Sequence, residues 1–217
     1  MRPYPAPVPA LQDDALCIRH WDWSETSQTV SLLTREHGMI RGLAKGSKRE
    51  KGRFSGGVEL LTRGQVLFIS KPGSELATLT EWDLQELFPG LGRDLRRFYA
   101  GMYLADLLQH SIRDQDPHPG AYDAALACLR RLGQPGDPGG TDEPLARFQW
   151  SLLREMGYRP ELARDVRTGG ALPDAGRYYF APHQGGLTTT AGDGSTPAWP
   201  VRAETVACLK LLPHGEP

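Results

Sequence analysis

The sequence predicts an α+β protein, in which an N-terminal β-barrel precedes an α-helical bundle with a loop-rich insert. Three features of the 217 residues indicate this architecture. Short apolar segments separated by glycine turns fill roughly the first 88 residues. Apolar residues at helical spacing follow Pro89-Gly90, and residues 159–200 are rich in Gly, Pro and Thr.

Five strand-like segments make up the predicted barrel: residues 15–23, 29–34, 39–44, 58–70 and 75–82. One long basic loop joins the third segment to the fourth. Short strands, glycine turns and a single long loop favour a small Greek-key barrel of the oligonucleotide-binding (OB) type. An SH3-like barrel fits the same pattern nearly as well.

Alternation along the first segment predicts which of its side chains face the barrel core. The predicted core face consists of Leu16, Ile18 and His20. The predicted outer face consists of Cys17, Arg19, Trp21 and Trp23. Arginine and tryptophan side chains would therefore lie side by side on the surface of this strand.

The second half of the chain has a helical period. Residues 94–112, 119–132 and 143–156 carry apolar side chains three or four positions apart, which predicts three helices. Residues 177–181 predict a short strand, and residues 201–212 predict a closing helix. The predicted parts are a flexible tail (1–12), the barrel domain (13–88), a helical domain (89–158 and 201–217) and the insert (159–200).

Composition excludes several classes of protein. Mean hydropathy is −0.44, and no apolar run approaches the roughly 20 residues that span a bilayer, so we expect no membrane association. Three widely spaced cysteines predict no disulfide framework and favour a reducing cytoplasm. Six scattered histidines show no metal-ligand spacing, and Gly42–Ser47 lacks the Gly-Lys-Ser order of a phosphate loop. We therefore predict no enzyme activity, no catalytic residues and no cofactor.

Positive charge is concentrated in residues 35–53, which hold seven basic residues and two acidic ones in a chain of net charge −1. Such a glycine-punctuated segment is typical of a surface that binds a polyanion. Single-stranded nucleic acid is usually held by cations and by aromatic rings that stack on bases. Trp21, Trp23 and Phe54 are the aromatic candidates. The alternatives are a solvated charge run and two tryptophans that pack against the barrel or the helices.

The predicted binding site consists of basic residues and one aromatic residue, and it contains no metal ligand. Its members are Arg19, Trp23, Arg35, Arg41, Lys45, Lys48, Arg49, Lys51 and Arg53. Five of these cations, from Lys45 to Arg53, lie on a glycine-bounded loop that is poor material for a core. Phosphate contact is the interpretation that we favour for this loop, and binding should depend steeply on salt.

Four stretches of this sequence resemble one known family. Residues 31–62 read SLLTREHGMIRGLAKGSKREKGRFSGGVELLT, and residues 75–84 read ELATLTEWDL. FYAGMYLADLL (98–108) and RFQWSLLREMGYRPEL (147–162) follow in the helical half. Together they are similar to the RecO family of DNA repair proteins, from about residue 15 to the end of the chain.

The resemblance implies a recombination mediator rather than an enzyme. It implies binding to single- and double-stranded DNA, annealing of complementary strands, and help in loading recombinase onto gapped DNA. The implied partners are RecR, single-strand-binding protein and, indirectly, RecA, in a cytoplasmic, nucleoid-associated setting. The alternative is an OB-fold scaffold for protein interactions, or an RNA-binding protein without annealing activity.

The resemblance also implies a difference from many family members, which carry a four-cysteine zinc module after a GYxPEL motif. Here GYRPEL is followed at the four ligand positions by Asp165, Thr168, Thr189 and Gly192. Threonine and glycine side chains do not form a tetrahedral zinc site. We predict that the insert holds no zinc and is stabilised by the packing of Leu172, Tyr178, Phe180 and Leu187.

Overall fold

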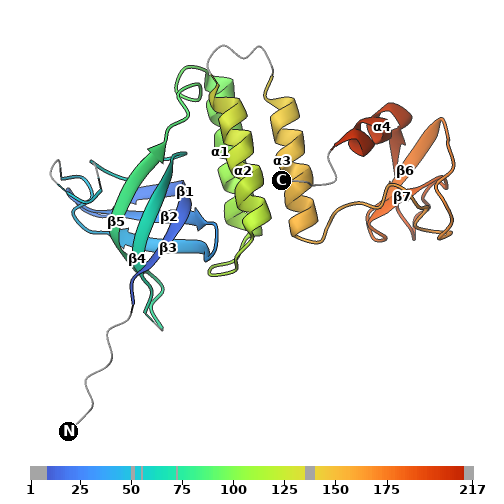
Figure 1. The fold of residues 1–217 in the computed structure, drawn as a ribbon. Coiled ribbons are helices and arrows are strands. Elements are labelled where there is room, and N and C mark those ends of the chain that lie inside the picture. Colours follow the sequence, from blue (N-terminus) through green and yellow to red (C-terminus); the bar gives the residue numbers. More distant parts are fainter. Residues whose placement is uncertain (1–8, 50–51, 55, 72, 135–139, 213–217) are drawn as a thin grey trace, which may run out of the picture. The chain divides into compact units, whose positions relative to one another are not determined.

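The computed structural model describes residues 9–49, 52–54, 56–71, 73–134 and 140–212. The chain divides into two compact units, Met1–Phe148 and Gln149–Pro217. The elements of the chain are drawn in Figure 1. In chain order they are β1 (Leu11–Asp22), β2 (Gln28–Thr34), β3 (Gly38–Ala44), β4 (Arg63–Ile69), β5 (Ala77–Glu86), α1 (Leu95–Ser111), α2 (Pro119–Gly133), α3 (Asp142–Glu155), β6 (Arg177–Ala181), β7 (Gly186–Thr188), β8 (Trp199–Arg202) and α4 (Ala203–Leu211).

The first five strands close into a barrel in the order β1-β2-β3-β5-β4. β1 pairs with both β2 and β4, which closes the sheet, and β3 pairs in parallel with β5. The remaining neighbours are antiparallel, which gives the strand arrangement of an OB fold and confirms the predicted fold class. β1 begins before the predicted strand, because Leu11 already lies opposite Phe68 of β4.

The predicted faces of β1 are wrong at Leu16, Cys17 and Ile18. The Cys17 side chain is fully buried in the barrel core beside Ala15, whereas Leu16 and Ile18 are buried outside that cluster. A β-bulge between Cys17 and Arg19 shifts the register with β2. An extra residue in one strand breaks strict alternation, so a period of two does not describe this segment.

The helices follow their predicted bounds closely. The Asp94 carboxylate accepts hydrogen bonds from the backbone N–H of Arg96 and Arg97 and so caps α1. Pro119 opens α2, where the missing N–H costs no helical hydrogen bond. α1 packs against both α2 and β1, which places the two helices beside the barrel (Figure 1).

The connection between α1 and α2 lies against the β2–β3 turn. Gln115 donates its backbone N–H to the Met39 carbonyl at 3.0 Å. Gly38 has φ +70°, and a Cβ there would lie 2.3 Å from the Asp116 carbonyl oxygen. Glycine is therefore required at this turn both by its left-handed backbone and by the close approach of Asp116.

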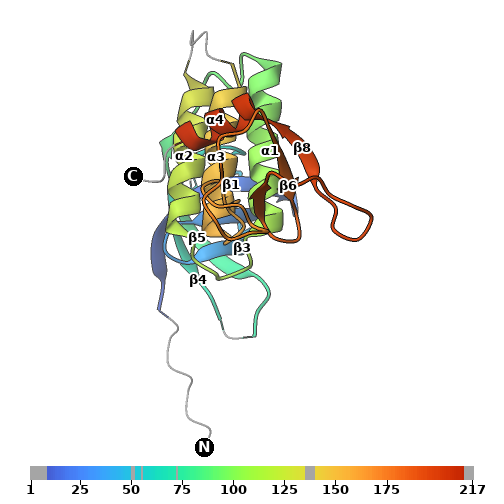
Figure 2. The same ribbon diagram turned by 90° about the vertical axis from the view of Figure 1, so that its right-hand side faces the viewer.

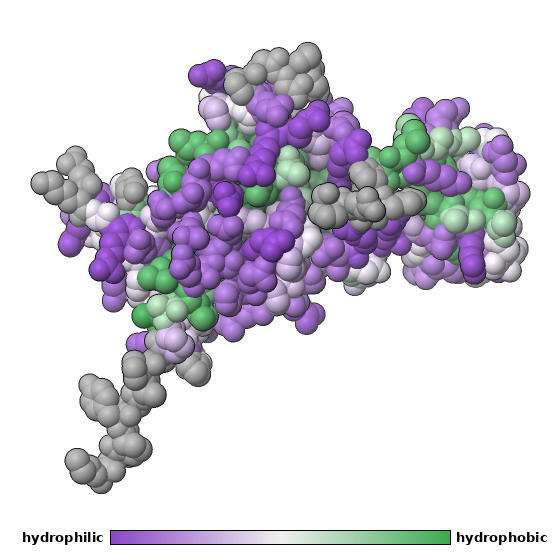
Figure 3. Space-filling view, viewed as in Figure 1, coloured by the Kyte–Doolittle hydropathy of each residue, from purple (hydrophilic) through white to green (hydrophobic). Residues whose placement is uncertain are grey.

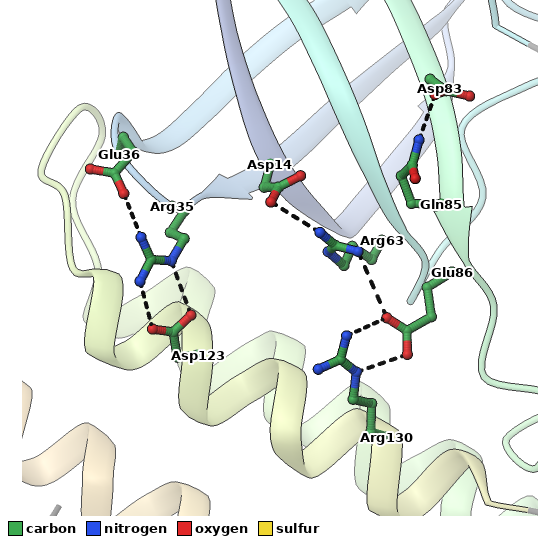
Figure 4. A network of polar contacts seen from close by, with 9 residues as sticks. All are labelled: Asp14, Arg35, Glu36, Arg63, Asp83, Gln85, Glu86, Asp123 and Arg130. Atoms are coloured by element: carbon green, nitrogen blue, oxygen red, sulfur yellow. Dashed lines mark hydrogen bonds and ion pairs between the residues drawn. The ribbon is translucent and has the colours of Figure 1, made fainter. Parts of the chain in front are cut away.

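Charged side chains join the barrel to α2, as Figure 4 shows. Glu86 at the end of β5 accepts two hydrogen bonds from Arg130, both at 2.8 Å, and lies 4.0 Å from Arg63. Arg63 donates in turn to the Asp14 carboxylate at 3.0 Å. The two hydrogen bonds from Arg130 are the main reason that the pKa of Glu86 lies below its usual value.

We expect that Glu86→Gln lowers the free energy of unfolding by about 1 kcal/mol, because Arg63 and Arg130 lose the carboxylate between them. The contribution of Glu86 is fully present above its unfolded-state pKa and is lost as the pH falls through the lower folded-state pKa. The variant should therefore lose less stability than the wild type on acidification. Urea unfolding at neutral and acid pH measures this, with exposed Glu81→Gln on the same strand as the control. Equal stability of the two variants would contradict it.

The second unit contains a three-stranded sheet in the order β7-β6-β8. α4 follows β8 directly in the chain, and Figure 2 labels β6, β8 and α4 in this unit. Its core is formed by Trp150, Leu162, Tyr178, Leu187 and Val206, with Leu172 and Phe180 packed against them. The packing predicted for the insert is thus confirmed. Apolar surface gathers on this unit near α4 on the face seen in Figure 3.

β6 has its predicted bounds, but the sequence pattern did not predict β7 and β8. These strands are three and four residues long, which is too short for alternation to be recognised. The closing helix α4 packs with β8, and its buried Val206 belongs to the core of the second unit. The C-terminal helix therefore forms one unit with the loop-rich residues that precede it.

Candidate nucleic-acid interface

The basic surface is built from two loops of the barrel, the β1–β2 turn and the β3–β4 loop. Lys48 donates its backbone N–H to the Thr26 carbonyl at 3.2 Å, and Gly46 donates to the Ser27 hydroxyl at 3.1 Å. Lys48 Nζ also lies 2.6 Å from Asp22 at the end of β1. These contacts join the beginning of the basic loop to the turn beside it.

Gln28 holds the two ends of the β3–β4 loop. Its side chain is 3% exposed, and its Oε1 accepts hydrogen bonds from the Ser47 hydroxyl and the Val58 N–H, both at 3.0 Å. The buried Gln28 amide thus contacts both Ser47, three residues after the end of β3, and Val58, in the last part of the loop. Both ends of the basic loop are therefore held by hydrogen bonds to the same buried side chain, Gln28.

Three of the predicted site residues form ion pairs with α1, with α2 or with the connection between these helices. Arg35 contacts Asp123 of α2 at 3.0 Å, and Arg41 contacts Asp114 at 3.3 Å. Arg19 lies 4.0 Å from Asp106 of α1. Arg35 also contacts Glu36 at 2.7 Å. Each of these three arginines therefore has at least one carboxylate beside it.

Three other cations of the predicted site are exposed: Lys45, Arg49 and Arg53. Within the described part of the chain, no ion pair involves any of them. Lys48 is half-buried and paired with Asp22, and Lys51 lies outside the described residues. The loop therefore presents cations whose charge is not already neutralised by a carboxylate of the described chain.

The three candidate aromatic residues have different surroundings. Trp21 and Trp23 are 51% and 65% exposed, and the Arg19 guanidinium lies 5.7 Å from the Trp21 ring centre. Phe54 is only 5% exposed and belongs to the barrel core. The prediction of Phe54 as a stacking residue is wrong, because its ring fills the interior beneath the basic loop. Both tryptophans are accessible to a ligand.

Family models match the two halves of the chain. Recombination protein O N terminal covers residues 9–88, and Recombination protein O C terminal covers residues 92–216. The chain belongs to the RecO family. No described helix has the length and apolar character needed to cross a membrane.

Curated relatives named DNA repair protein RecO resemble this chain over much of its length. The Rhodopirellula baltica protein is 39% identical over 150 residues, which cover 69% of this chain and 54% of that protein. The Burkholderia pseudomallei protein is 35% identical over 219 residues, which cover 93% of this chain and 75% of that protein. The chain is thus grouped with DNA repair proteins, although it spans little more than half the length of the Rhodopirellula relative.

The resemblance to RecO implies zinc ligands at four positions, and in this chain the first of them is occupied by Asp165. Its carboxylate accepts hydrogen bonds from residues at two of the other positions, Thr168 and Thr189. Asp165 is 2% exposed, and its Oδ1 accepts the backbone N–H of Arg167 at 2.9 Å and of Thr168 at 3.2 Å. Its Oδ2 accepts the Thr189 N–H at 3.0 Å. The hydroxyls of Thr188 and Thr189 donate to the same oxygen at 3.1 and 3.3 Å. Asp165 thereby connects residues 165–168 with residues 188–189.

Burial by itself would raise the pKa of the Asp165 carboxyl. The backbone N–H groups of Thr189, Arg167 and Thr168 and the Thr188 hydroxyl outweigh burial and hold the pKa at about 2. The carboxylate is therefore charged at neutral pH. Its negative charge is stabilised by hydrogen-bond donors that point at it from two segments.

Arg167 makes a second connection between the same segments. Its guanidinium donates to the carbonyls of Ala191 and Thr196 at 3.1 and 2.8 Å. These acceptors lie on either side of Gly192, the fourth position at which a ligand would be expected. Asp165 and Arg167 thus hold together, through hydrogen bonds, the two loops that a metal would otherwise bridge.

These residues do not fit zinc. Of the four positions only Asp165 offers a metal ligand, and the threonine hydroxyls around it already donate to its oxygens. The described residues contain no cluster of three or more His, Cys, Asp or Glu side chains that could hold a metal ion.

We expect elemental analysis of the purified protein to find no stoichiometric zinc, because the donor set lacks the nitrogen and sulfur ligands that zinc prefers. Treatment with a chelator should leave the thermal unfolding curve unchanged, whereas a structural metal contributes directly to folding. A value near one zinc per chain would contradict our interpretation of Asp165.

Proposed function

We propose that this chain is a DNA repair and recombination mediator that binds single- and double-stranded DNA through the β3–β4 loop. The observation that carries the proposal is the set of exposed cations Lys45, Arg49 and Arg53, which have no ion-pair partner among the described residues. Phosphate groups would supply the missing negative charge. Membership of a family whose curated relatives are named DNA repair protein RecO supports DNA as the polyanion.

Annealing of complementary strands follows from the same surface. Two single strands repel each other through their phosphates, and a cationic surface reduces that repulsion. Contacts to phosphates leave the base edges free to pair. The proposed role needs no covalent chemistry and therefore no catalytic residue.

The proposed partners are RecR, single-strand-binding protein and, indirectly, RecA, which the protein would help to load onto gapped DNA. Arg19, Arg35 and Arg41 would lie at the border of the DNA-binding surface, where a phosphate would compete with the carboxylates beside them. Lys48 and Lys51 complete the proposed loop contacts. The corresponding location is the cytoplasm, in association with the nucleoid.

Fluorescence anisotropy of a labelled oligonucleotide tests the proposal, with single strands and duplexes at low and physiological salt. We expect binding at low salt and a linear fall of log affinity with log salt, with a slope of about −0.7 per single-strand phosphate neutralised. Mixing two complementary labelled strands with the protein should speed their pairing. Absence of binding at low salt would contradict the proposal and favour a protein-interaction scaffold.

A further inference from the structure

A pocket of about 330 Å³ lies between the β1–β2 turn and the beginning of the β3–β4 loop. Trp23 and Ser27 line it from the turn, and Lys45, Gly46 and Arg49 line it from the loop. Its volume is within the range of roughly 300–1,000 Å³ that is usual for small-molecule sites. The pocket therefore combines an indole, two cations and hydroxyl groups in a space suited to a small polar and aromatic group.

A hydrogen bond holds the backbone of Trp23, whereas its indole ring is exposed to solvent. The Trp23 N–H donates to the Ser27 carbonyl at 2.9 Å, which closes the turn on which the side chain stands. The indole itself is 65% exposed, so it does not serve as part of the barrel core. An exposed aromatic ring on a fixed backbone can stack on a nucleic-acid base with little loss of backbone entropy.

The two cations are placed by the loop that carries them. Gly46 has φ +70°, and the Arg49 side chain passes over it, so that a Cβ at Gly46 would lie 3.5 Å from Arg49 Cδ and Nε. Lys48, which lies between Lys45 and Arg49 in the sequence, is held by its ion pair with Asp22. Lys45 and Arg49 therefore both line the pocket from the β3–β4 loop, where each can contact an anionic group that enters it.

We propose that this pocket is a single-nucleotide subsite for single-stranded DNA, in which an unpaired base stacks on Trp23 and its phosphate contacts Lys45 and Arg49. The inference rests on the proposed function and adds a means of distinguishing single strands from duplexes. In a duplex both faces of each base are covered by its neighbours, so the indole has nothing to stack on. Phosphates are present in both forms, so the two cations serve both.

The test is a comparison of affinities for a thymidine oligonucleotide and for a duplex of the same length. We expect that Trp23→Ala weakens single-strand binding about 5- to 100-fold, the range for one stacked base, and changes duplex binding less than about twofold. Trp23→Phe should restore much of the single-strand affinity. Trp199→Ala is the matched control, because Trp199 is 59% exposed and lies in the second unit.

The outcomes separate this inference from the proposed function. Salt-dependent binding of both DNA forms by the wild type, with no loss in Trp23→Ala, would overturn the subsite and leave the proposed function intact. Equal losses for single strand and duplex would also overturn it, because stacking cannot act on both. Failure of the wild type to bind either form would overturn both. If Trp23→Ala does not fold, Trp23→Phe against the wild type gives the same comparison with a smaller effect.

Discussion

Replacing Lys45 and Arg49 together with glutamate is expected to weaken binding of single-stranded DNA by at least about a hundredfold at low salt. Each cation is exposed and has no ion pair among the described residues, so its charge is available to a phosphate. A hydrogen bond to a charged group is worth about 1.5–3 kcal/mol, and reversal adds repulsion to that loss. Anisotropy titrations at several salt concentrations measure the affinity and its salt dependence, which should become shallower in the variant.

The control has the same change in net charge elsewhere on the first unit. Lys71 and Arg93 are exposed and lie outside the loop, so replacing both with glutamate reproduces the alteration in total charge. This control should keep most of the DNA affinity. Equal weakening in the two double variants would mean that overall charge, and not the β3–β4 loop, governs binding.

Reversal of Lys48 is less informative than reversal of Lys45 or Arg49. Lys48 contacts Asp22 at 2.6 Å, and a glutamate there would repel that carboxylate and disturb the turn next to the pocket. A loss of affinity could then follow from a displaced loop. The pair Lys45 and Arg49 avoids this difficulty because neither side chain has a described ion-pair partner that would be left behind.

We expect that Asp165→Asn lowers the free energy of unfolding of the second unit by about 3 kcal/mol. Five donors converge on the Asp165 carboxylate, and an amide in its place turns one acceptor oxygen into a donor that faces other donors. Buried groups left without partners cost about 1–3 kcal/mol each. Hydrogen exchange within residues 159–200 should increase, while exchange in the barrel should stay near the wild-type rate.

The pH dependence gives a separate measurement of the same carboxylate. Its pKa is about 2 in the folded protein, below the ordinary value of 3.8, so its contribution to stability is complete above that value. The contribution is lost as the pH falls towards 2, and Asp165→Asn should remove this part of the acid sensitivity. Asp174→Asn is the control, because Asp174 is exposed and has one long contact, 3.5 Å from the Tyr178 hydroxyl. A loss of stability equal to that of the control would contradict the role given to Asp165.

Periodicity and turn residues were sufficient to predict the barrel strands, the three long helices and the basic loop. Each of these features depends on residues that are near one another in the chain, such as the Asp94 cap of α1 or the helical apolar spacing that follows it. β1 differs from its prediction because a bulge at Cys17 interrupts its alternation, and β4 begins at Arg63 and not at Val58. β7 and β8 were missed because three or four residues carry too little pattern.

Within the candidate site, the positions of the charged residues could be predicted from the sequence. Which of these charges are left without an ion pair in the described chain, and so can contact a ligand, could not. Arg35 and Lys45 look alike in a basic stretch, yet Arg35 meets Asp123, which is 88 positions away. Phe54 follows the same cations in sequence and lies in the barrel core. Ion pairing and burial depend on which distant residues the folded chain brings within a few ångströms, and no local spacing encodes that.

The same distinction applies to the second unit. The identities of Asp165, Thr168, Thr189 and Gly192 are enough to argue against zinc, since ligand chemistry belongs to the residue type. The hydrogen-bond network around Asp165 could not be predicted in this way, because only folding brings the donors of residues 188–189 to this carboxylate. A carboxylate becomes a structural centre only when its surroundings exclude water and supply hydrogen bonds, and those surroundings exist only in the folded chain.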